Sequence, residues 1–161
     1  MAAILKLDTI QTSNGLGVIT SPNKIVYPGA ILQTVNATTN TQFSTTSTTY
    51  VSSGFTATIT PMYANSKILV MYTCGGIESN STAVTPKGSI QVWRNGSSVF
   101  TVGNMIMYGS TGSAGPAANF YDMPNSTSAI TYTMYFSSYA GTFYVGTNSS
   151  NNTLTLLEIA Q

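Results

Sequence analysis

Short runs in which apolar residues alternate with threonine or serine recur along most of this 161-residue chain. In FTATIT, residues 55–60, Phe55, Ala57 and Ile59 fall on one side of an extended strand and threonines fall on the other. AITYTMYF, residues 129–136, repeats the pattern. Because an alternation of period two fits a half-buried strand and does not fit a helix, these runs predict a chain built of β-strands.

The composition agrees with a single all-β domain. A hydrophobic content of 42% is too high for a disordered chain, and 161 residues are enough for one domain with its own core. Charged residues make up only 6%, against roughly a quarter in an average soluble domain. We therefore expect hydroxyl and amide groups, rather than charges, to keep the surface hydrated.

From Ala30 onward the strand signals follow one another at the short spacing of a β-sandwich or β-barrel. They predict eight to ten strands and no helix. Asn95 and Gly96 lie between two such runs and predict a hairpin with a type I′ turn, which requires positive φ angles. Two longer stretches, residues 75–88 and 103–116, are predicted to be loops.

The first 28 residues differ from the rest of the chain. Two prolines and three glycines between residues 15 and 29 disfavour a continuous strand. We expect residues 1–28 to form an extended arm and residues 29–161 to form the sandwich domain; the alternative is that the arm is an edge strand of the body. The arm has an apolar patch of its own, and its candidate docking residues are Ile4, Leu5, Leu7 and Ile10.

The sequence offers little for catalysis, and we expect no enzyme, no metal site and no cofactor. There is no histidine, so the commonest general base and metal ligand is missing. The four carboxylates are isolated from one another in sequence; Glu78 with Asp122 is the one pair we consider for a glycoside hydrolase. The five lysines and arginines are spread along the chain, which excludes the basic stripe that nucleic-acid binding needs.

Cys74 is the single cysteine, so no internal disulfide can form. It continues an apolar run, and we expect a buried small side chain rather than a reactive thiol. The opening MAAILKLDTIQ lacks the apolar core of a signal peptide, and no apolar stretch is long enough to cross a membrane. We therefore expect neither a targeting signal nor membrane insertion.

Two strand-like runs are apolar on both sides: KILVMYTC, residues 67–74, and TLTLLEI, residues 153–159. In the second run, Leu157 and Ile159 point away from the side that carries Leu154 and Leu156. A two-sheet sandwich covers only one side of each sheet, so the second side needs another cover. An oligomer supplies one, and we predict Leu157, Glu158 and Ile159 at its interface.

Glu158 interrupts this apolar ending, and an unpaired charge there would be costly. Candidate partners are Arg94 and Lys67, from the same chain or a neighbour. A ring of Glu158 side chains about a symmetry axis would need protonation or water, and an exposed edge position is the alternative.

Several segments resemble one protein family: PGAILQTVNATTNTQFSTTSTTYVSSGFTATITP, then SKILVMY, GSIQVWRNGSSVF, YDMPNSTSAITYTMYF and the closing TLTLLEIAQ. From about Tyr27 to Gln161 the chain resembles small jelly-roll virion structural or tail-fibre-like proteins of tailed bacteriophages, especially marine ones. The opening ILKLDTIQTSNGLG resembles the attachment segments of such proteins. These motifs are structural patterns, less specific than a catalytic signature.

The resemblance implies an antiparallel jelly-roll sandwich, similar in shape to C1q and tumour-necrosis-factor heads, with a short N-terminal arm. It also implies a homotrimer with the last strand near the three-fold axis, located on the virion and assembled in the host cytoplasm. Other virion proteins, or a host surface glycan, would be its partners, in a capsid-decoration or tail-fibre role. Outward loop contacts would come from Glu78, Lys87, Met105, Met107 and Tyr108.

A stand-alone lectin is the alternative from a different class. Aromatic side chains stack on sugar rings, and Trp93, Tyr108 and Tyr121 are the candidates for such a site. Most of the ten tyrosines are explained more simply as strand residues with their hydroxyl groups at the surface.

Overall fold

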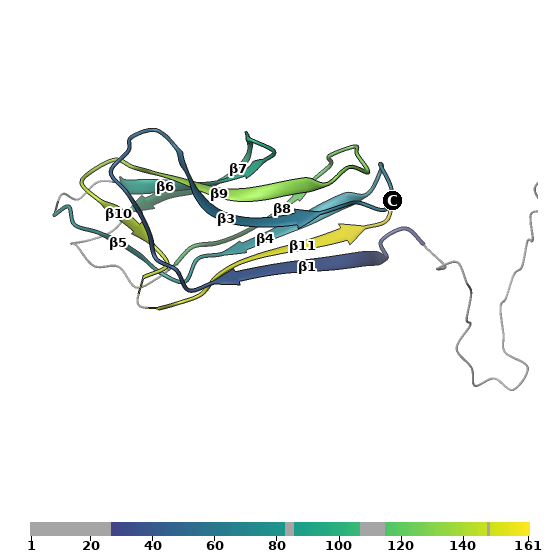
Figure 1. Cartoon of the computed structure of the whole chain (residues 1–161), viewed down its shortest axis with the longest axis horizontal. Coiled ribbons are helices and arrows are strands. Elements are labelled where there is room, and N and C mark those ends of the chain that lie inside the picture. The colour runs from purple at the N-terminus through teal and green to yellow at the C-terminus, as the bar shows by residue number, and fades with distance from the viewer. Residues whose placement is uncertain (1–26, 83–85, 107–114, 148) are drawn as a thin grey trace, which may run out of the picture.

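The computed structural model describes residues 27–82, 86–106, 115–147 and 149–161, and over these residues the chain is a sandwich of antiparallel strands (Figure 1). The described part contains eleven strands and no helix. The strands are β1 (Ile31–Thr39), β2 (Phe43–Thr45), β3 (Val51–Ile59), β4 (Lys67–Thr73), β5 (Ile77–Ser79), β6 (Pro86–Arg94), β7 (Ser97–Ile106), β8 (Ala117–Asp122), β9 (Ile130–Ser138), β10 (Phe143–Val145) and β11 (Asn152–Ile159).

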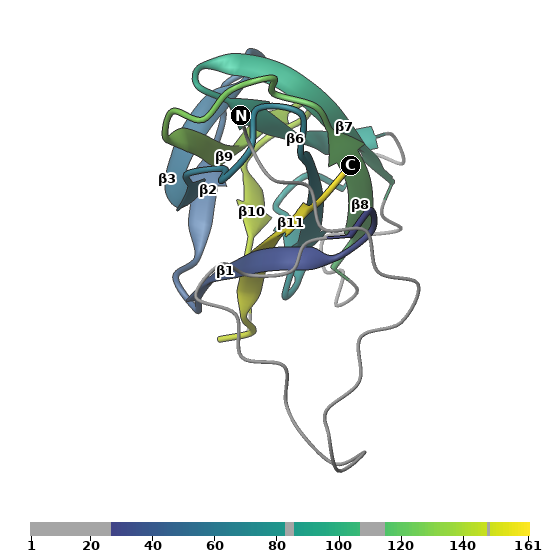
Figure 2. The ribbon, with the colours of Figure 1, turned by 90° about the vertical axis from the view of Figure 1, so that its right-hand side faces the viewer.

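Two four-stranded sheets form the sandwich, with strand orders β1–β11–β4–β8 and β3–β9–β6–β7. Figure 2 looks at one end, where the two sheets enclose the core. A small sheet, β2–β10–β5, lies at the opposite end. Among the eight long strands the first lies beside the last and the second beside the seventh, which is the order of a jelly roll. The expectation of an antiparallel jelly-roll sandwich is confirmed.

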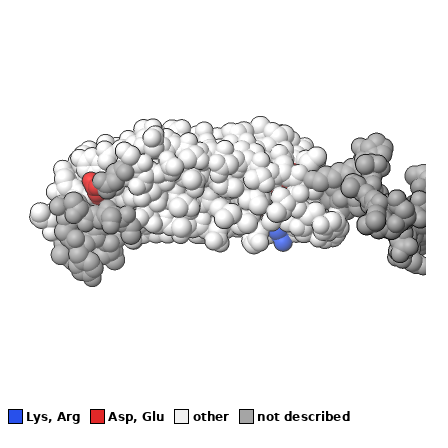
Figure 3. Space-filling model, turned by 90° about the horizontal axis from the view of Figure 1, so that it is seen from below, with Lys and Arg blue, Asp and Glu red and all other residues white. Residues whose placement is uncertain are grey.

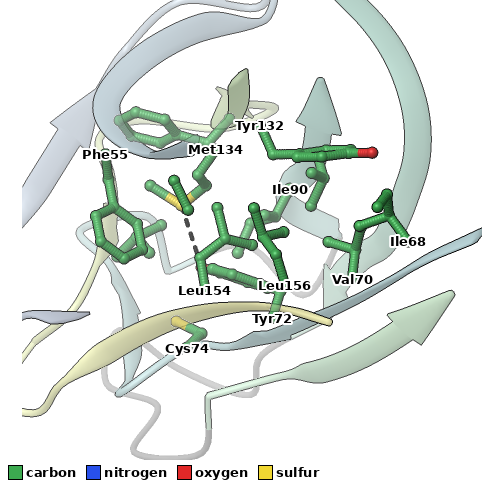
Figure 4. Close-up of a cluster of buried hydrophobic side chains, with 14 of the residues drawn as sticks. Phe55, Ile68, Val70, Tyr72, Cys74, Ile90, Tyr132, Met134, Leu154 and Leu156 are labelled. Atoms are coloured by element: carbon green, nitrogen blue, oxygen red, sulfur yellow. Dashed lines mark hydrogen bonds between the residues drawn. The ribbon is translucent and has the colours of Figure 1, made fainter. Parts of the chain in front are cut away.

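The core lies between the two long sheets and receives side chains from both (Figure 4). Tyr72 and Met134 come from opposite sheets, and the Tyr72 hydroxyl donates a hydrogen bond to the Met134 sulfur over 3.1 Å. Among the most deeply buried members are Ile59, Ile68, Val70, Ile90, Val92, Ile130, Tyr132, Leu154 and Leu156.

Several predictions from residue patterns are confirmed. The alternation in FTATIT buries Phe55, Ala57 and Ile59, and the alternation in AITYTMYF buries its own apolar side in the same way. The hairpin turn has φ angles of 47° at Asn95 and 85° at Gly96, as a type I′ turn requires. Burial of Cys74 is confirmed too.

The structure differs from the predictions where local irregularities override the pattern. Alternation along AILQTV, residues 30–35, predicts Ile31 on the same side as Gln33 and Val35, but a bulge between Ile31 and Gln33 turns Ile31 outward. The stretch predicted as a loop at residues 75–88 contains β5 and the start of β6, and the one at 103–116 contains the end of β7. Strands as short as three residues give too little alternation for a sequence pattern to detect.

The described chain begins beside its own C-terminus. The Gly29 amide donates to the Ala160 carbonyl oxygen, and the Ala160 amide donates to the Ala30 carbonyl oxygen, both over 2.9 Å. We call the end of the sandwich where these residues meet the arm end. The opposite end, which carries β2, β5 and β10, is the far end (Figure 1). The predicted docking residues Ile4, Leu5, Leu7 and Ile10 lie outside the described residues. Within the described ranges no helix is long and apolar enough to cross a membrane.

Candidate interaction surface

The outer side of the β1–β11–β4–β8 sheet carries a cluster of apolar side chains toward the arm end. In the strand register, Leu157 of β11 lies opposite Leu69 of β4, and Leu69 lies opposite Tyr121 of β8. Ile159 lies opposite Ile31 on β1. These side chains are half-buried or exposed, although strands of a sandwich normally present polar residues to water.

The apolar cluster continues around the edge of the sheet onto the arm end itself. The first described residue, the β3–β4 connection and the residue after β8 each add exposed side chains there. We call the combined set the arm-end apolar surface; it consists of Tyr27, Ile31, Met62, Tyr63, Leu69, Met71, Tyr121, Met123, Leu157 and Ile159. The described part has eight large apolar side chains that are strongly exposed. Six of them lie at the arm end, and a seventh, Met71, lies further along β4 on the same surface.

Charge is nearly absent around this surface. Seen from the side on which β1 lies, the described residues are almost wholly uncharged (Figure 3). Lys67, half-buried at the start of β4 and in register with Ile159, is the charged residue among the outward-facing positions described for this sheet. The surface therefore suits an apolar partner better than a highly charged one.

The outer side of the other long sheet is different. Threonines lie opposite one another there, Thr56 beside Thr133 and Thr58 beside Thr131, and the last pair is hydrogen-bonded over 2.9 Å. Gln91 donates to the Thr101 hydroxyl over 3.0 Å. Away from the arm end, the outer side of the first sheet is polar as well, since the Asn36 side chain donates to the Thr155 hydroxyl over 2.7 Å. Both sheets come from the same chain, so low overall charge does not explain why only the arm-end part of this outer side is apolar.

The three predicted interface residues divide between the two sides of β11. Leu157 and Ile159 point outward and belong to the arm-end apolar surface, whereas Glu158 points inward and is fully buried. Their role in an oligomer remains a prediction, and the placement favours it for Leu157 and Ile159.

Glu158 finds its partners within its own chain. Its carboxylate accepts hydrogen bonds from the Gln33 side-chain amide over 2.6 Å and from the backbone amides of Met62 and Tyr63 over 2.8 and 3.2 Å. The expected partners, Arg94 and Lys67, are not among these donors. Backbone amides can satisfy a buried carboxylate, and here they tie the β3–β4 connection to the last strand.

Arg94 pairs with Asp122 instead. Its guanidinium Nη1 lies 2.8 and 2.9 Å from the two carboxylate oxygens, and the Tyr132 hydroxyl donates to Asp122 over 2.7 Å. Burial, followed by the nearby Asp122 carboxylate, raises the pKa of Tyr132 far above its usual value. This network joins β8 of one sheet to β6 and β9 of the other near the arm end, so it holds the sandwich closed there.

The candidate hydrolase pair is not brought together. Glu78 lies on β5 at the far end, whereas Asp122 ends β8 near the arm end and is engaged by Arg94. Three or more potential metal-binding side chains do not meet anywhere in the described part of the chain.

The predicted outward contacts are only partly on the surface. Glu78 is half-exposed, but Lys87 and Met105 are buried rather than outward-facing. The Lys87 ammonium donates to the Ser81 carbonyl oxygen over 2.8 Å, and Lys87 belongs to β6, where a loop was predicted. Met107 and Tyr108 lie outside the described residues.

The candidate sugar-stacking residues do not form one site. Trp93 stacks on Tyr135 with ring centroids 4.0 Å apart on the polar outer side, whereas Tyr121 is exposed on the other sheet. Tyr108 lies outside the described residues. An uncharged groove of about 450 Å³ runs between β1 and β3 and is lined by threonines, Ser53 and the rings of Phe43 and Phe55. The alternation of FTATIT did not reveal this groove, because it depends on how two sheet edges meet.

No protein-family model matches the chain, and no curated protein matches it. Solved structures of infectious bursal disease virus particles show partial similarity. The VP2 subviral particle is 11% identical over 90% of this chain and 37% of that chain, with a TM-score of 0.48. The structure of the Gx strain is 14% identical over 91% and 42%, with a TM-score of 0.34. The chain thus spans about two fifths of their length, and the jelly-roll assignment rests on its own strand order.

Proposed function

We propose that this protein is a non-enzymatic structural component of a tailed-bacteriophage virion, a homotrimeric jelly-roll appendage on the particle surface. The proposal rests on the uneven distribution of exposed apolar residues over the sandwich. Most of them gather at the end where residues 1–26 join the body. The resemblance of the strand segments to phage virion proteins supports the same role.

In this proposal the arm attaches the body to the particle through Ile4, Leu5, Leu7 and Ile10. The far end, with β5 and Glu78, then faces outward or toward a neighbouring protein. A jelly-roll body of this size suits a capsid decoration protein or a small terminal knob of a tail fibre.

Labelling purified phage particles with gold-coupled antibody against this protein tests the proposal. We expect gold at regular positions on the capsid for a decoration protein, or at the tail tip for a fibre. Particles without label, from cells that contain the soluble protein, would contradict a virion role. Particles from a phage that lacks the gene serve as the control.

A stand-alone lectin is the second candidate, favoured by the groove between β1 and β3. Hydroxyl groups and two phenyl rings without any charge suit a neutral sugar better than a charged ligand. Glycan-array binding by the isolated protein that is lost in Phe43→Ala, and kept in Thr133→Ala on the other outer side, would support this function. Absence of binding by any form would count against it.

A further inference from the structure

We infer that the arm-end apolar surface is the contact between copies of this chain, and that a second copy covers it. This inference rests on the proposed homotrimer and adds the surface that builds it. The inferred contact also differs from the interface predicted from the sequence. It does not include Glu158, and it includes Tyr121, Leu69 and Met71.

The first argument is the difference between the arm-end part of one outer side and the outer side of the other long sheet. Hydroxyl and amide groups bond to one another across β3, β9, β6 and β7, as in the Thr58–Thr131 and Gln91–Thr101 pairs. The outer side of β11 and β4 offers leucine, isoleucine and methionine toward the arm end. A side exposed to water gains nothing from those residues, so the difference indicates a cover.

The second argument is area. The exposed fraction differs among the ten side chains of the surface. Tyr27 and Tyr121 are the most exposed, at 66% and 62%, and Leu69, Leu157 and Ile159 are half-buried. With roughly 200 Å² for a fully exposed large side chain, they leave on the order of 900 Å² accessible. Stable specific interfaces bury about 800 Å² on each partner. The surface is therefore large enough for a stable contact.

The third argument is charge, which favours a second copy over a highly charged partner. Lys67 is the charge at the outward positions described, and the net charge of the whole chain is +1. Two copies therefore meet without appreciable repulsion, and the side chains show no charge pattern that would select an acidic or basic partner. Closed symmetry lets every copy cover the same surface.

The β3–β4 connection is held in place for this contact. Glu158 fixes the backbone of Met62 and Tyr63, whose side chains are exposed at the arm end. A contact surface that is already ordered loses less conformational entropy on association. Glu158 thus acts as a positioning residue from inside the sandwich.

Two exposed tyrosines provide a matched test in the full-length protein. Tyr121→Lys places a charge on the arm-end apolar surface, and Tyr139→Lys places the same charge at the far end, where the tyrosine is 47% exposed. We expect light scattering to give the assembled mass for the wild type and for Tyr139→Lys, and a shift toward the 17.0 kDa single chain for Tyr121→Lys. Equal masses for both variants and the wild type would overturn the inference.

Oxidation of Met71 by hydrogen peroxide gives a second readout that needs no variant. Met71 is 42% exposed in the single chain, so we expect slow oxidation in the assembly and several-fold faster oxidation on dilution or in Tyr121→Lys. A rate that is fast and independent of concentration would overturn the inference even if a variant failed to fold. A wild type of single-chain mass would overturn the homotrimer as well, while gold labelling tests the virion role separately.

Discussion

Among single residues, Glu158 joins three parts of the arm end. Its carboxylate receives hydrogen bonds from β1 through Gln33 and from the β3–β4 connection through Met62 and Tyr63. All three donors are neutral groups, so the buried carboxyl group is held by hydrogen bonds alone. Such a site depends on every donor, because a buried carboxylate that loses partners keeps its desolvation cost.

Glu158→Gln therefore has a clear expected effect. The amide that replaces one carboxylate oxygen cannot accept from both sides, so one of the three donors loses its partner. We expect the free energy of unfolding to fall by about 1 to 3 kcal/mol in urea titrations. Ser98→Ala, at an exposed position of β7, is the control and should change stability much less. Equal stabilities of the two variants would argue against a structural role for the Glu158 carboxylate.

Tyr132 gives the protein a pH dependence in the alkaline range. Its pKa is raised from 10.0 because burial and the neighbouring Asp122 disfavour the phenolate. Above pH 10 the unfolded chain releases a proton that the folded chain retains. The contribution of Tyr132 to the free energy of unfolding is therefore fully present below pH 10 and is lost as the pH rises above it. Each such tyrosine contributes a slope of up to about 1.4 kcal/mol per pH unit.

We expect Tyr132→Phe to reduce this slope in urea titrations between pH 9 and 11.5. Tyr72 retains a contribution of its own in that variant, because burial raises its pKa as well. Tyr139→Phe, at an exposed position of the far end, is the control. A slope unchanged in Tyr132→Phe would show that the hydroxyl does not remain protonated as the structure requires.

Among the elements, the β6–β7 hairpin depends on one glycine. Gly96 has a φ of 85°, and a Cβ added there would meet nothing within 4 Å, so a substitution affects only the backbone conformation. We expect Gly96→Ala to lower the free energy of unfolding by about 1 to 2 kcal/mol. Ser98→Ala, two residues further on an exposed position of β7, should stay within about 0.5 kcal/mol. A neutral Gly96→Ala would indicate that the turn adopts another type.

The same scale shows which elements the sequence predicts. The predictions for FTATIT, AITYTMYF and the Asn95–Gly96 turn are confirmed because they rest on local signals. These signals are an alternation of period two and a residue pair that favours positive φ angles. The small sheet of β2, β10 and β5 has no such signal, since three-residue strands are defined by their neighbours. Tertiary contacts also decide the outward turn of Ile31 and the burial of Lys87.

The candidate site divides in the same manner. Apolar residues on both sides of TLTLLEI predict that its outward side needs a cover, and the structure places Leu157 and Ile159 on that side. The sequence could not assign the partners of Glu158, because backbone amides of a distant connection leave no trace in residue types. Nor could it group Tyr27, Met62 and Met123, which only the jelly-roll topology brings to one end.

In the whole molecule, the arm and the body have separate roles in the proposed function. We expect Leu5→Asp with Leu7→Asp to abolish incorporation into phage particles, because two charges would weaken apolar docking of the arm. The mass and unfolding curve of the protein should stay unchanged. Lys6→Gln with Asp8→Asn is the control, and normal incorporation of the Leu5 and Leu7 variant, measured by mass spectrometry of purified particles, would contradict docking through the arm.

The orientation of the body follows from the same arrangement. In the proposed homotrimer, copies that meet at the arm-end apolar surface bring their first described residues close together, so we expect several arms of one assembly to engage one site on the particle. Linked attachments of this kind bind more tightly than one arm alone. The far end then lies away from the contact, where the groove between β1 and β3 opens toward solvent.

The solution mass of the full-length protein, measured by light scattering over a range of concentrations, tests the central claim most directly. The account predicts a stable assembly, because the arm-end apolar surface needs a cover, and a mass of three 17.0 kDa chains, because the proposed appendage is a homotrimer. A protein that stays at 17.0 kDa at every concentration would contradict the homotrimer and leave the outward side of β11 and β4 exposed to water.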